Sequence, residues 1–439
     1  MNVFWKKLFG GLTPTSKLEK MEFELTQSMR RYTEVENSLE LAEYKSLFRE
    51  VKSSGFIENK KTLQNRRYKD TEEYRNSKKL TKLENSAALN IYFQVLKSKM
   101  LEQYLNFKAT PEYIDLGDKT KLKTSEKLQT LKNFERSKSY KTYCRFHESY
   151  ILKEYNELKK LCSTPEFKSK NAFWQNQNRW KTTPEYAKEQ RFYELAKNPD
   201  IVFYLNEKPE RFNEYKKLKL SFSDEFQWNT LTNSRWDFGF KYKSAKLIGN
   251  HSYTNEKQAN NEGRNISVEN GHLTLRTKHD KVKSKAWDHI HGFVEKEFDF
   301  SSDVIQTANE FRQKGGAFSA KLRCTGKINH AFWLGSDNKT TLINIFHFDG
   351  KHIKVGNINK NKFEGTTVRG ISPLSYYIYS LKWTDKELIW MINNIEVYRT
   401  KNNIPNEAMY LVFNSFIPSK MTGSTGSLEV DWVRVYKID

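Results

Sequence analysis

The sequence has few of the features that mark disulfide-linked, secreted or membrane-spanning proteins. Its three cysteines, Cys144, Cys162 and Cys324, are far apart and form no Cys-x-x-Cys pair, so they predict neither a disulfide framework nor a zinc site. No apolar run approaches the roughly 20 residues that a membrane-spanning helix needs. No secretory signal is evident at the start, where Lys6 and Lys7 interrupt the only apolar stretch. We therefore expect synthesis in a reducing cytoplasm.

The chain is rich instead in basic and aromatic side chains. Lys and Arg number 75 against 53 Asp and Glu, which gives a formal net charge of +22, and aromatic residues make up 14% of the 439 residues. Disordered chains are poor in aromatic residues, so we expect two or three packed domains. The charge suits nucleic acid, an anionic membrane surface or an acidic protein as partner. Because acidic residues are interleaved, we favour solubility over specific nucleic-acid binding as its role.

Residues 15–219 have the pattern of short α-helices. Apolar residues recur three and four positions apart, as they do between residues 39 and 51. Thr-Pro-Glu sequences begin at Thr110, Thr164 and Thr183, and each combines an N-cap residue, a proline at the first helical position and an acid at the positive end of the helix dipole. These signals predict short helices joined by tight turns, as a helical bundle or a helical-hairpin array.

A weak internal repeat in the sequence bears on the choice between a bundle and an array. The offset is constant at the 112 residues that separate Arg67 from Arg179. A duplicated segment would favour a helical array with long lateral surfaces. Chance similarity within an ordinary bundle is the alternative, and the sequence leaves both open. The superposed residues are Arg67, Tyr74, Leu83, Leu89 and Tyr92 on Arg179, Tyr186, Leu195, Ile201 and Tyr204.

Beyond Lys219 the hydrophobic period changes from that of helices to that of strands. Alternating runs occur at 272–276, 317–322 and 428–435, with turn residues such as Asn393-Asn394 between runs of this kind. Period two with frequent turns predicts an antiparallel β-sandwich. No spacer rich in Gly, Pro or Ser separates the halves, so the helical part should run directly into the first strand.

These patterns predict three segments. Residues 1–20 would form an N-terminal docking arm, in which Phe4, Trp5, Leu8 and Phe9 make an apolar patch for a partner or a membrane interface. Residues 21–219 would form a basic α-helical domain. Residues 220–439 would form the β-sandwich. The predicted fold class is therefore multidomain α + β.

Five sequence blocks follow one another along the C-terminal half. They are Leu220–Phe226 with Ser234–Trp236, Glu269–Leu275, Gly315–Leu322 with His330–Leu334, Tyr376–Trp383, and Glu429–Tyr436. In their order and spacing these blocks resemble glycoside hydrolase family 16 domains of the laminarinase type. The resemblance implies a concanavalin A-like jelly roll, whose concave face binds β-glucan or a related polysaccharide in active relatives.

The resemblance also implies where a catalytic motif would lie. Active relatives carry Glu-x-Asp-x-x-Glu on one inner strand, as nucleophile, assisting aspartate and acid/base. The matching positions here are Leu342, Asn344 and His347. Retaining hydrolysis needs two carboxyl groups about 5–5.5 Å apart, and leucine cannot act as a nucleophile. The nearby Asp337 and Asp349 fall at no matching position and are typical of turns. We therefore predict a pseudo-glycosidase with a degenerate former active site.

The residual site retains groups that suit a sugar. Asn344 and His347 can form hydrogen bonds with hydroxyl groups, and Trp333 could stack on a sugar ring or pack in the core beside Phe332. The sequence therefore predicts either a weak carbohydrate-binding cleft formed by Trp333, Asn344 and His347, or an inert relic.

Metal signals are weaker. We predict no cofactor other than a structural calcium ion, for which the resemblance suggests Glu225 and Asp431. His289 and His291 alternate, as a metal pair on one strand face would.

A polysaccharide-binding fold without an export signal is typical of a phage virion protein, assembled in the cytoplasm and released by lysis. Our interpretation is a non-catalytic structural protein of a virion. Its helical half would bind other subunits in an oligomer, and its jelly roll would serve carbohydrate binding, decoration or packing. The alternatives are an active family 16 type glycan hydrolase and a nucleic-acid-associated basic protein.

Overall fold

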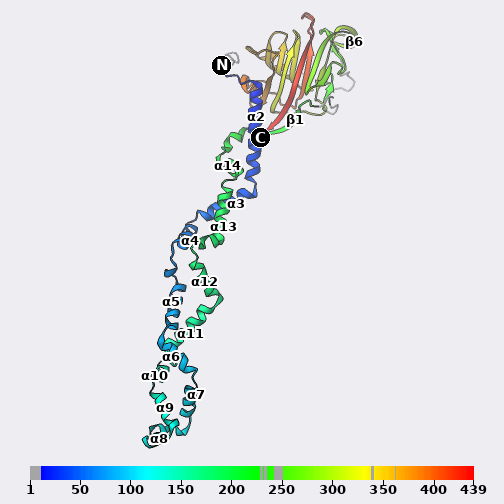
Figure 1. The fold of residues 1–439 in the computed structure, drawn as a ribbon. Coiled ribbons are helices and arrows are strands. Elements are labelled where there is room, and N and C mark those ends of the chain that lie inside the picture. Colours follow the sequence, from blue (N-terminus) through cyan, green and yellow to red (C-terminus); the bar gives the residue numbers. More distant parts are fainter. Residues whose placement is uncertain (1–10, 228–230, 232–234, 242–250, 338–340, 361) are drawn as a thin grey trace. The chain divides into compact units, whose positions relative to one another are not determined.

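The structure, a computed structural model, describes residues 11–227, 231, 235–241, 251–337, 341–360 and 362–439. Helices extend to Lys216 and strands begin at Leu218, within two residues of the predicted change of period (Figure 1). Two compact units result: one consists of Glu34–Asn206, the other of residues 11–33 together with 207–439. This division differs from the predicted boundaries at residues 20 and 219. Among the described residues, no helix is long and apolar enough to cross a membrane.

Short, capped helices build the unit of Glu34–Asn206. The Ser38 hydroxyl accepts a hydrogen bond from the Leu41 N–H at 3.2 Å, and similar caps recur at most helix starts. Such a cap contributes about 1 kcal/mol, which helps helices of ten residues persist. The helices are α3 (Leu39–Val51), α4 (Ser54–Asn65), α5 (Glu72–Glu84), α6 (Ala87–Leu96), α7 (Lys99–Lys108), α8 (Lys119–Thr124), α9 (Glu126–Arg136), α10 (Lys138–Phe146), α11 (Tyr150–Ser163), α12 (Pro165–Gln175), α13 (Pro184–Leu195) and α14 (Pro199–Asn206).

Two of the three Thr-Pro-Glu starts are confirmed as α-helix caps. Thr164 accepts from the Phe167 N–H and Thr183 from the Tyr186 N–H, both at 3.2 Å. Thr110 instead precedes a 3₁₀ helix, η2 (Pro111–Gly117), and its side chain accepts no cap bond there.

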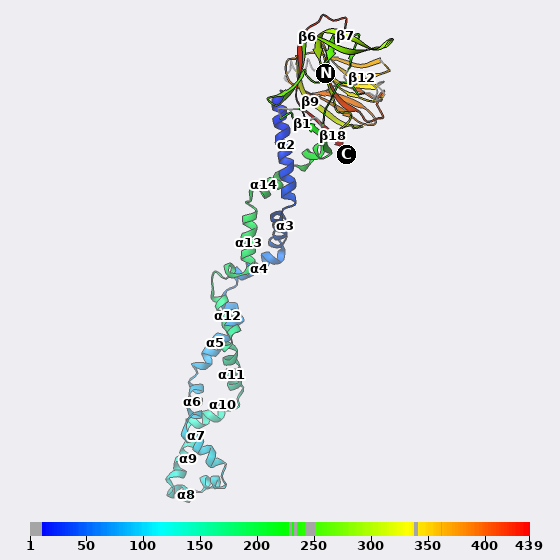
Figure 2. The same ribbon diagram turned by 90° about the vertical axis from the view of Figure 1, so that its right-hand side faces the viewer.

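Helices of the first half of this unit pack against helices of the second half in reverse order. α3 contacts α13, α5 contacts α11, and α6 contacts α10 (Figures 1 and 2). Three separate apolar clusters follow from this arrangement, centred on Leu41, Phe56 and Tyr104. The predicted helical region is therefore present, but its main contacts join helices far apart in the sequence and not the consecutive helices of a hairpin array.

The internal repeat is visible in the order of elements. A 3₁₀ turn, η1 (Tyr68–Asp70), precedes α5 and α6, and η3 (Arg179–Thr182) precedes α13 and α14. The N-caps of α5 and α13 are Thr71 and Thr183, separated by the offset seen in the sequence. The α3–α13 and α5–α11 contacts are equivalent under this repeat, because α3 corresponds to α11.

Two sheets form the β-sandwich, and most of their strand pairs are antiparallel. Only the short β3–β6 and β4–β7 pairs are parallel among the described strands. The first sheet has the order β16 (Ile395–Thr400), β15 (Leu388–Ile392), β14 (Tyr377–Trp383), β9 (Gly316–Thr325), β18 (Gly426–Ile438), β6 (His272–Asp288), β7 (Gly292–Ser302), β4 (Gln258–Asn260). Three more strands join it at the side: β1 (Leu218–Asp224) pairs with β18, and β3 (Ser252–Tyr253) and β5 (Ile266–Glu269) pair with β6. The second has the order β13 (Lys362–Val368), β12 (Ile353–Asn359), β11 (Thr341–Asp349), β10 (Asn329–Gly335), β17 (Tyr410–Phe416), β8 (Val304–Gln306), β2 (Asp237–Phe238).

The main core lies between the two sheets. Alternate residues of the second sheet, such as Phe332, Ile343 and Phe413, point into it and are fully buried. Their neighbours along each strand must face the other way, because successive side chains of a strand alternate. That second face carries the candidate site.

The N-terminal helix α2 (Thr15–Glu36) packs on the outer face of the first sheet. Leu18 is buried with Ile378 of β14 and Trp432 of β18. Glu19 accepts hydrogen bonds from Lys321, at 2.9 and 3.0 Å, and from the Trp432 indole at 2.9 Å. The described part of the predicted docking arm, residues 11–20, therefore packs on its own jelly roll. Phe4, Trp5, Leu8 and Phe9 lie outside the described residues.

We predict that α2 contributes to the stability of the jelly roll. Glu19→Ala should lower the free energy of unfolding by about 1–2 kcal/mol, because Lys321 and Trp432 lose a charge-assisted partner. Urea denaturation of the full chain measures this change. Glu24→Ala is the matched control, since the Glu24 side chain is exposed and 3.9 Å from Lys20. Equal stability of the two variants would contradict a structural role for α2.

Candidate functional site

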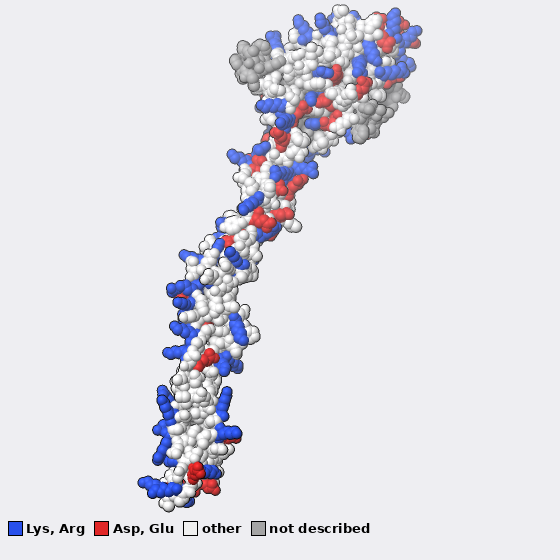
Figure 3. Space-filling model, in the orientation of Figure 1, with Lys and Arg blue, Asp and Glu red and all other residues white. Residues whose placement is uncertain are grey.

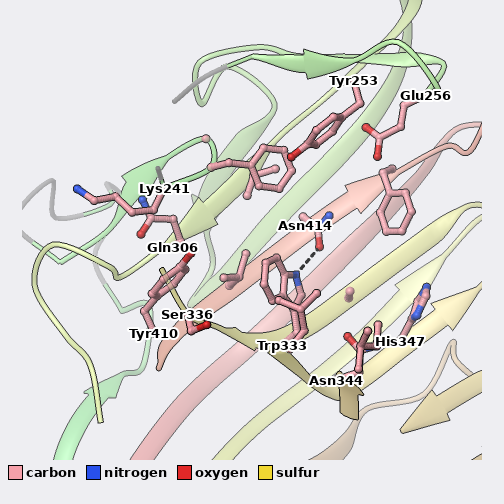
Figure 4. Close-up of a pocket in the computed structure, with 18 residues that line it drawn as sticks. Lys241, Tyr253, Glu256, Gln306, Trp333, Ser336, Asn344, His347, Tyr410 and Asn414 are labelled. Atoms are coloured by element: carbon pink, nitrogen blue, oxygen red, sulfur yellow. Dashed lines mark hydrogen bonds between the residues drawn. The ribbon is translucent and has the colours of Figure 1, made fainter. Parts of the chain in front are cut away.

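A cavity of about 350 Å³ lies on the face of the second sheet opposite the core (Figure 4). Four of its strands supply alternate residues to the cavity: β8 gives Gln306, β10 gives Trp333, β11 gives Asn344 and β17 gives Asn414. The segment around β3 and β4 supplies the opposite wall.

The three positions of the predicted former active site meet in this cavity. Leu342, Asn344 and His347 all line it, although strict alternation would turn His347 toward the core. A break in the β11–β12 register between Asn344 and His347 inserts the extra residue. Phe346 and Phe348 thereby enter the core. The spacing predicted from the family resemblance thus corresponds to one face of β11.

Trp333 belongs to the cavity wall. Its side chain is half-buried, and its indole N–H donates to Asn414 Oδ1 at 3.0 Å. Phe332, its neighbour, is fully buried in the core. Of the two predicted roles for Trp333, the structure supports the one that faces the cavity.

Several polar groups of the cavity have no hydrogen-bond partner among the residues that the structure describes. His347 Nε2 and Ser336 Oγ are buried and receive or donate no hydrogen bond among the described residues. The Asn344 carbonyl accepts from the Trp390 indole at 2.9 Å, but its side-chain amide has no described partner. A buried polar group left unpaired costs about 1–3 kcal/mol, and such groups are rare in folded proteins. These groups are free to bind the hydroxyls of a ligand.

Aromatic rings surround the polar groups. Phe240, Tyr253, Tyr410 and Phe416 line the cavity together with Trp333. Flat apolar surfaces beside hydrogen-bonding groups suit the two kinds of surface of a sugar ring. The sequence did not single out these four rings, because alternation shows that residues share a face but not which face is open.

The carboxylates closest to the motif in sequence have other roles. Asp349 accepts from the backbone N–H groups of Lys351 and His352 at the β11–β12 turn and pairs with Lys354 at 2.7 Å. Burial raises and these partners lower its pKa, to about 2 overall. Asp337 lies 2.9 Å from Arg312.

Glu256 is the carboxylate that the sequence analysis missed. It is the sole acidic side chain among the described residues that line the cavity. Burial raises its pKa to about 7, against smaller opposing effects of Gln258 and Lys296. Glu256 lies between two very short strands, where no alternating pattern could have indicated its direction.

Two buried histidines differ in whether their ring nitrogens form hydrogen bonds. His330 is fully buried and bonds Ser415 Oγ at 2.8 Å and the Thr325 carbonyl at 2.9 Å. His347 leaves Nε2 unpaired. Burial lowers the pKa of both imidazoles to about 4.

The carboxylates suggested for calcium have cationic partners. Glu225 binds Arg434 through both oxygens, at 2.7 and 2.8 Å. Asp431 lies 2.7 Å from Lys321 and 3.2 Å from His272. The described residues contain no cluster of three or more metal-binding side chains. The calcium prediction gains no support from these contacts.

The suggested histidine pair does not lie on a strand face. His289 and His291 are exposed in the turn between β6 and β7, where His291 Nδ1 lies 3.0 Å from Asp288. β6 ends at Asp288, so the two histidines follow the strand and do not share one of its faces.

Basic side chains are spread widely. On the face drawn in Figure 3 they occur along the helical unit and over the jelly roll, with acidic side chains between them. Some form ion pairs, as Arg191 does with Glu43 at 3.0 Å.

His330 and His347 should make the folded protein less stable in acid. In the unfolded chain a histidine takes up a proton near pH 6.5, whereas in the folded chain His330 and His347 do so near pH 4. Their contribution is therefore complete above pH 6.5 and is lost as the pH falls toward 4, by about 3 kcal/mol for the fully buried His330. Glu256 acts in the opposite sense, because its raised pKa favours the folded state at low pH.

The test compares variants with the parent protein, so that the contributions of other titrating groups to the unfolding free energy cancel. His330→Gln and His347→Gln should each reduce the slope of unfolding free energy against pH between 4.5 and 6.5, measured by urea denaturation. His289→Gln, at an exposed position, should leave it unchanged. Identical slopes in all four proteins would refute the prediction.

No protein-family model and no curated protein matches the chain. Solved structures match its C-terminal half. The catalytic domain of an endo-1,3-beta-glucanase (laminarinase) from Thermotoga petrophila is 19% identical over 51% of this chain and 98% of its own, with a TM-score of 0.41. The endo-beta-1,3-glucanase from Pyrococcus furiosus is 17% identical over 51% and 95%, with a TM-score of 0.41. A non-specific endo-beta-1,3(4)-glucanase from family GH16 is 21% identical over 51% and 92%, with a TM-score of 0.42. The C-terminal half resembles these jelly-roll glucanases, as its sequence predicts.

Proposed function

We propose that the jelly roll is a non-catalytic carbohydrate-binding module. The observation that carries this proposal is that Leu342, Asn344 and His347 share the cavity face of β11. The position at which the resemblance implies a nucleophile is occupied by a side chain that cannot form a glycosyl ester. The other two positions, Asn344 and His347, offer hydrogen bonds without supplying a carboxylate.

The cavity suits binding better than hydrolysis. A retaining glycosidase needs a pair of carboxyl groups across the scissile bond. The described residues that line this cavity include only one carboxyl group, that of Glu256. The unpaired atoms of Ser336 and His347 would instead gain partners when hydroxyl groups enter. Trp333 and Tyr410 provide apolar surface for the ring.

Binding and catalysis can be tested on the same samples. The full chain should bind at least one of laminarin, lichenan, agarose and carrageenan in affinity electrophoresis, and should release no reducing sugar from any of them. Asn344→Ala and Trp333→Ala should weaken binding about tenfold or more, the equivalent of roughly 1.4 kcal/mol. Trp287→Ala is the matched control, because Trp287 is 37% exposed and does not line the cavity.

Two outcomes would contradict this proposal. Binding that is equal in all variants, or absent throughout, would show that the cavity is not a carbohydrate site. Turnover that disappears in Glu256→Gln would establish hydrolysis with Glu256 as the acid.

We propose further that the helical unit joins the jelly roll to other subunits, as in a structural protein of a virion. Apolar side chains remain exposed on it, including Leu39 at 85%, Ile114 at 82% and Tyr150 at 76%. Such surface is commonly covered by a partner. Phe192 of α13 does not add to this surface, because it is buried and its ring stacks on that of Tyr44, with centroids 5.5 Å apart.

Assembly has a direct readout. Mass spectrometry of particle fractions from a producing culture should find the protein at a fixed ratio to structural proteins. Ile114→Asp and Tyr150→Asp should reduce this incorporation at unchanged thermal stability, because they alter exposed positions only. Glu112→Gln, also exposed, is the control. A monomer that is absent from every particle fraction would overturn the assembly role.

A further inference from the structure

Glu256 occupies the wall of the cavity formed by the segment between β3 and β4. Its backbone N–H donates to the Tyr253 carbonyl at 3.1 Å, and its backbone pairs with Pro418. Figure 4 shows its side chain directed into the cavity, on the side opposite Asn344. This geometry places a carboxylate where a bound sugar would present its hydroxyls.

The carboxylate is only partly satisfied by the protein. Gln258 Nε2 donates to Oε2 at 2.6 Å, and no described residue donates to Oε1. The nearby Lys296 ammonium donates instead to the backbone carbonyls of Thr254, at 2.8 Å, and of Glu256, at 3.3 Å. One carboxylate oxygen therefore stays available for a ligand.

We propose that Glu256 is a ligand-contacting residue that selects neutral, hydroxyl-bearing sugars over anionic ones and makes their binding tighter as the pH rises from 6 to 8. This inference rests on the carbohydrate-binding function proposed above. An ionised carboxylate accepts a stronger hydrogen bond from a hydroxyl than a protonated one does. The same negative charge repels the sulfate or carboxylate groups of an acidic glycan. Lys241, the only Lys or Arg among the described lining residues, lies away from Glu256 in Figure 4 and donates to Asn309 Oδ1.

The direction of the pH effect follows from linkage. Burial raises the pKa of Glu256 to about 7, so ionised and protonated forms coexist near neutrality. A hydroxyl donated to Oε1 stabilises the ionised form and lowers this pKa. Binding must then release a proton, and affinity rises with pH until Glu256 is fully ionised.

Other groups that face Glu256 would not produce this profile. Tyr253 on β3 has a pKa raised to about 12 by burial, and His347 on β11 has one lowered to about 4, so neither titrates between pH 6 and 8. Lys296 on β7 contributes a positive charge that lowers the pKa of Glu256.

The test measures binding of the full chain to laminarin, lichenan and agarose as neutral probes and to carrageenan as a sulfated probe. For a neutral probe that binds, the affinity of the parent protein should rise about three- to tenfold from pH 6 to pH 8. The rise can reach about tenfold for each unit by which binding lowers the pKa of Glu256. Glu256→Gln should remove this dependence and relax the discrimination against carrageenan. Glu295→Gln, an exposed change on β7, should behave as the parent.

A second variant guards against a trivial loss of structure. Lys296→Met should keep the carboxylate and raise its pKa, so the rise in affinity should move to higher pH. A neutral probe that binds equally to all four proteins, with the same pH profile, would overturn the role of Glu256 and leave carbohydrate binding intact. Binding of none of the four probes would overturn both, and preferred or exclusive binding of carrageenan by the parent would refute the selectivity.

Discussion

The β11–β12 register break determines both the core and the site of the jelly roll. A strand sends alternate side chains to opposite faces, so an unbroken β11 would bury His347 and expose Phe346. The extra residue after Asn344 lets Phe346 and Phe348 fill the core while His347 reaches the cavity. A backbone feature thus brings Leu342, Asn344 and His347 to the same face of β11.

The contrast between two histidines shows how the cavity differs from the core. Both imidazoles are held neutral by burial, but His330 has partners on both nitrogens and His347 does not. Folded proteins rarely leave such groups unpaired without a compensating role. His347, Ser336 and Oε1 of Glu256 therefore form a set of hydrogen-bonding groups with spare capacity, within an aromatic wall that a sugar ring can use.

The compact unit that contains the jelly roll is not one continuous segment of chain. Helix α2 covers Ile378 and Trp432 of the first sheet, and Glu19 is the partner of Lys321 there. The sequence placed the first 20 residues in a separate arm because helical periodicity reveals an apolar face but not what covers it. Contact between segments hundreds of residues apart is a tertiary property, so the compact units cut across the predicted boundary.

The sequence by itself determined the two architectures, the change of period near Lys219, and the strand on which Leu342, Asn344 and His347 lie. Local signals suffice for these features, because helix caps, alternation and turn residues act within a few positions. Only the tertiary structure decided that Trp333 faces the cavity, that Glu225 and Asp431 engage Arg434 and Lys321, and that Glu256 joins the site. Glu256 lies in an irregular segment, where no periodic pattern specifies direction, and its distance in sequence from β11 is bridged only when the sheets fold.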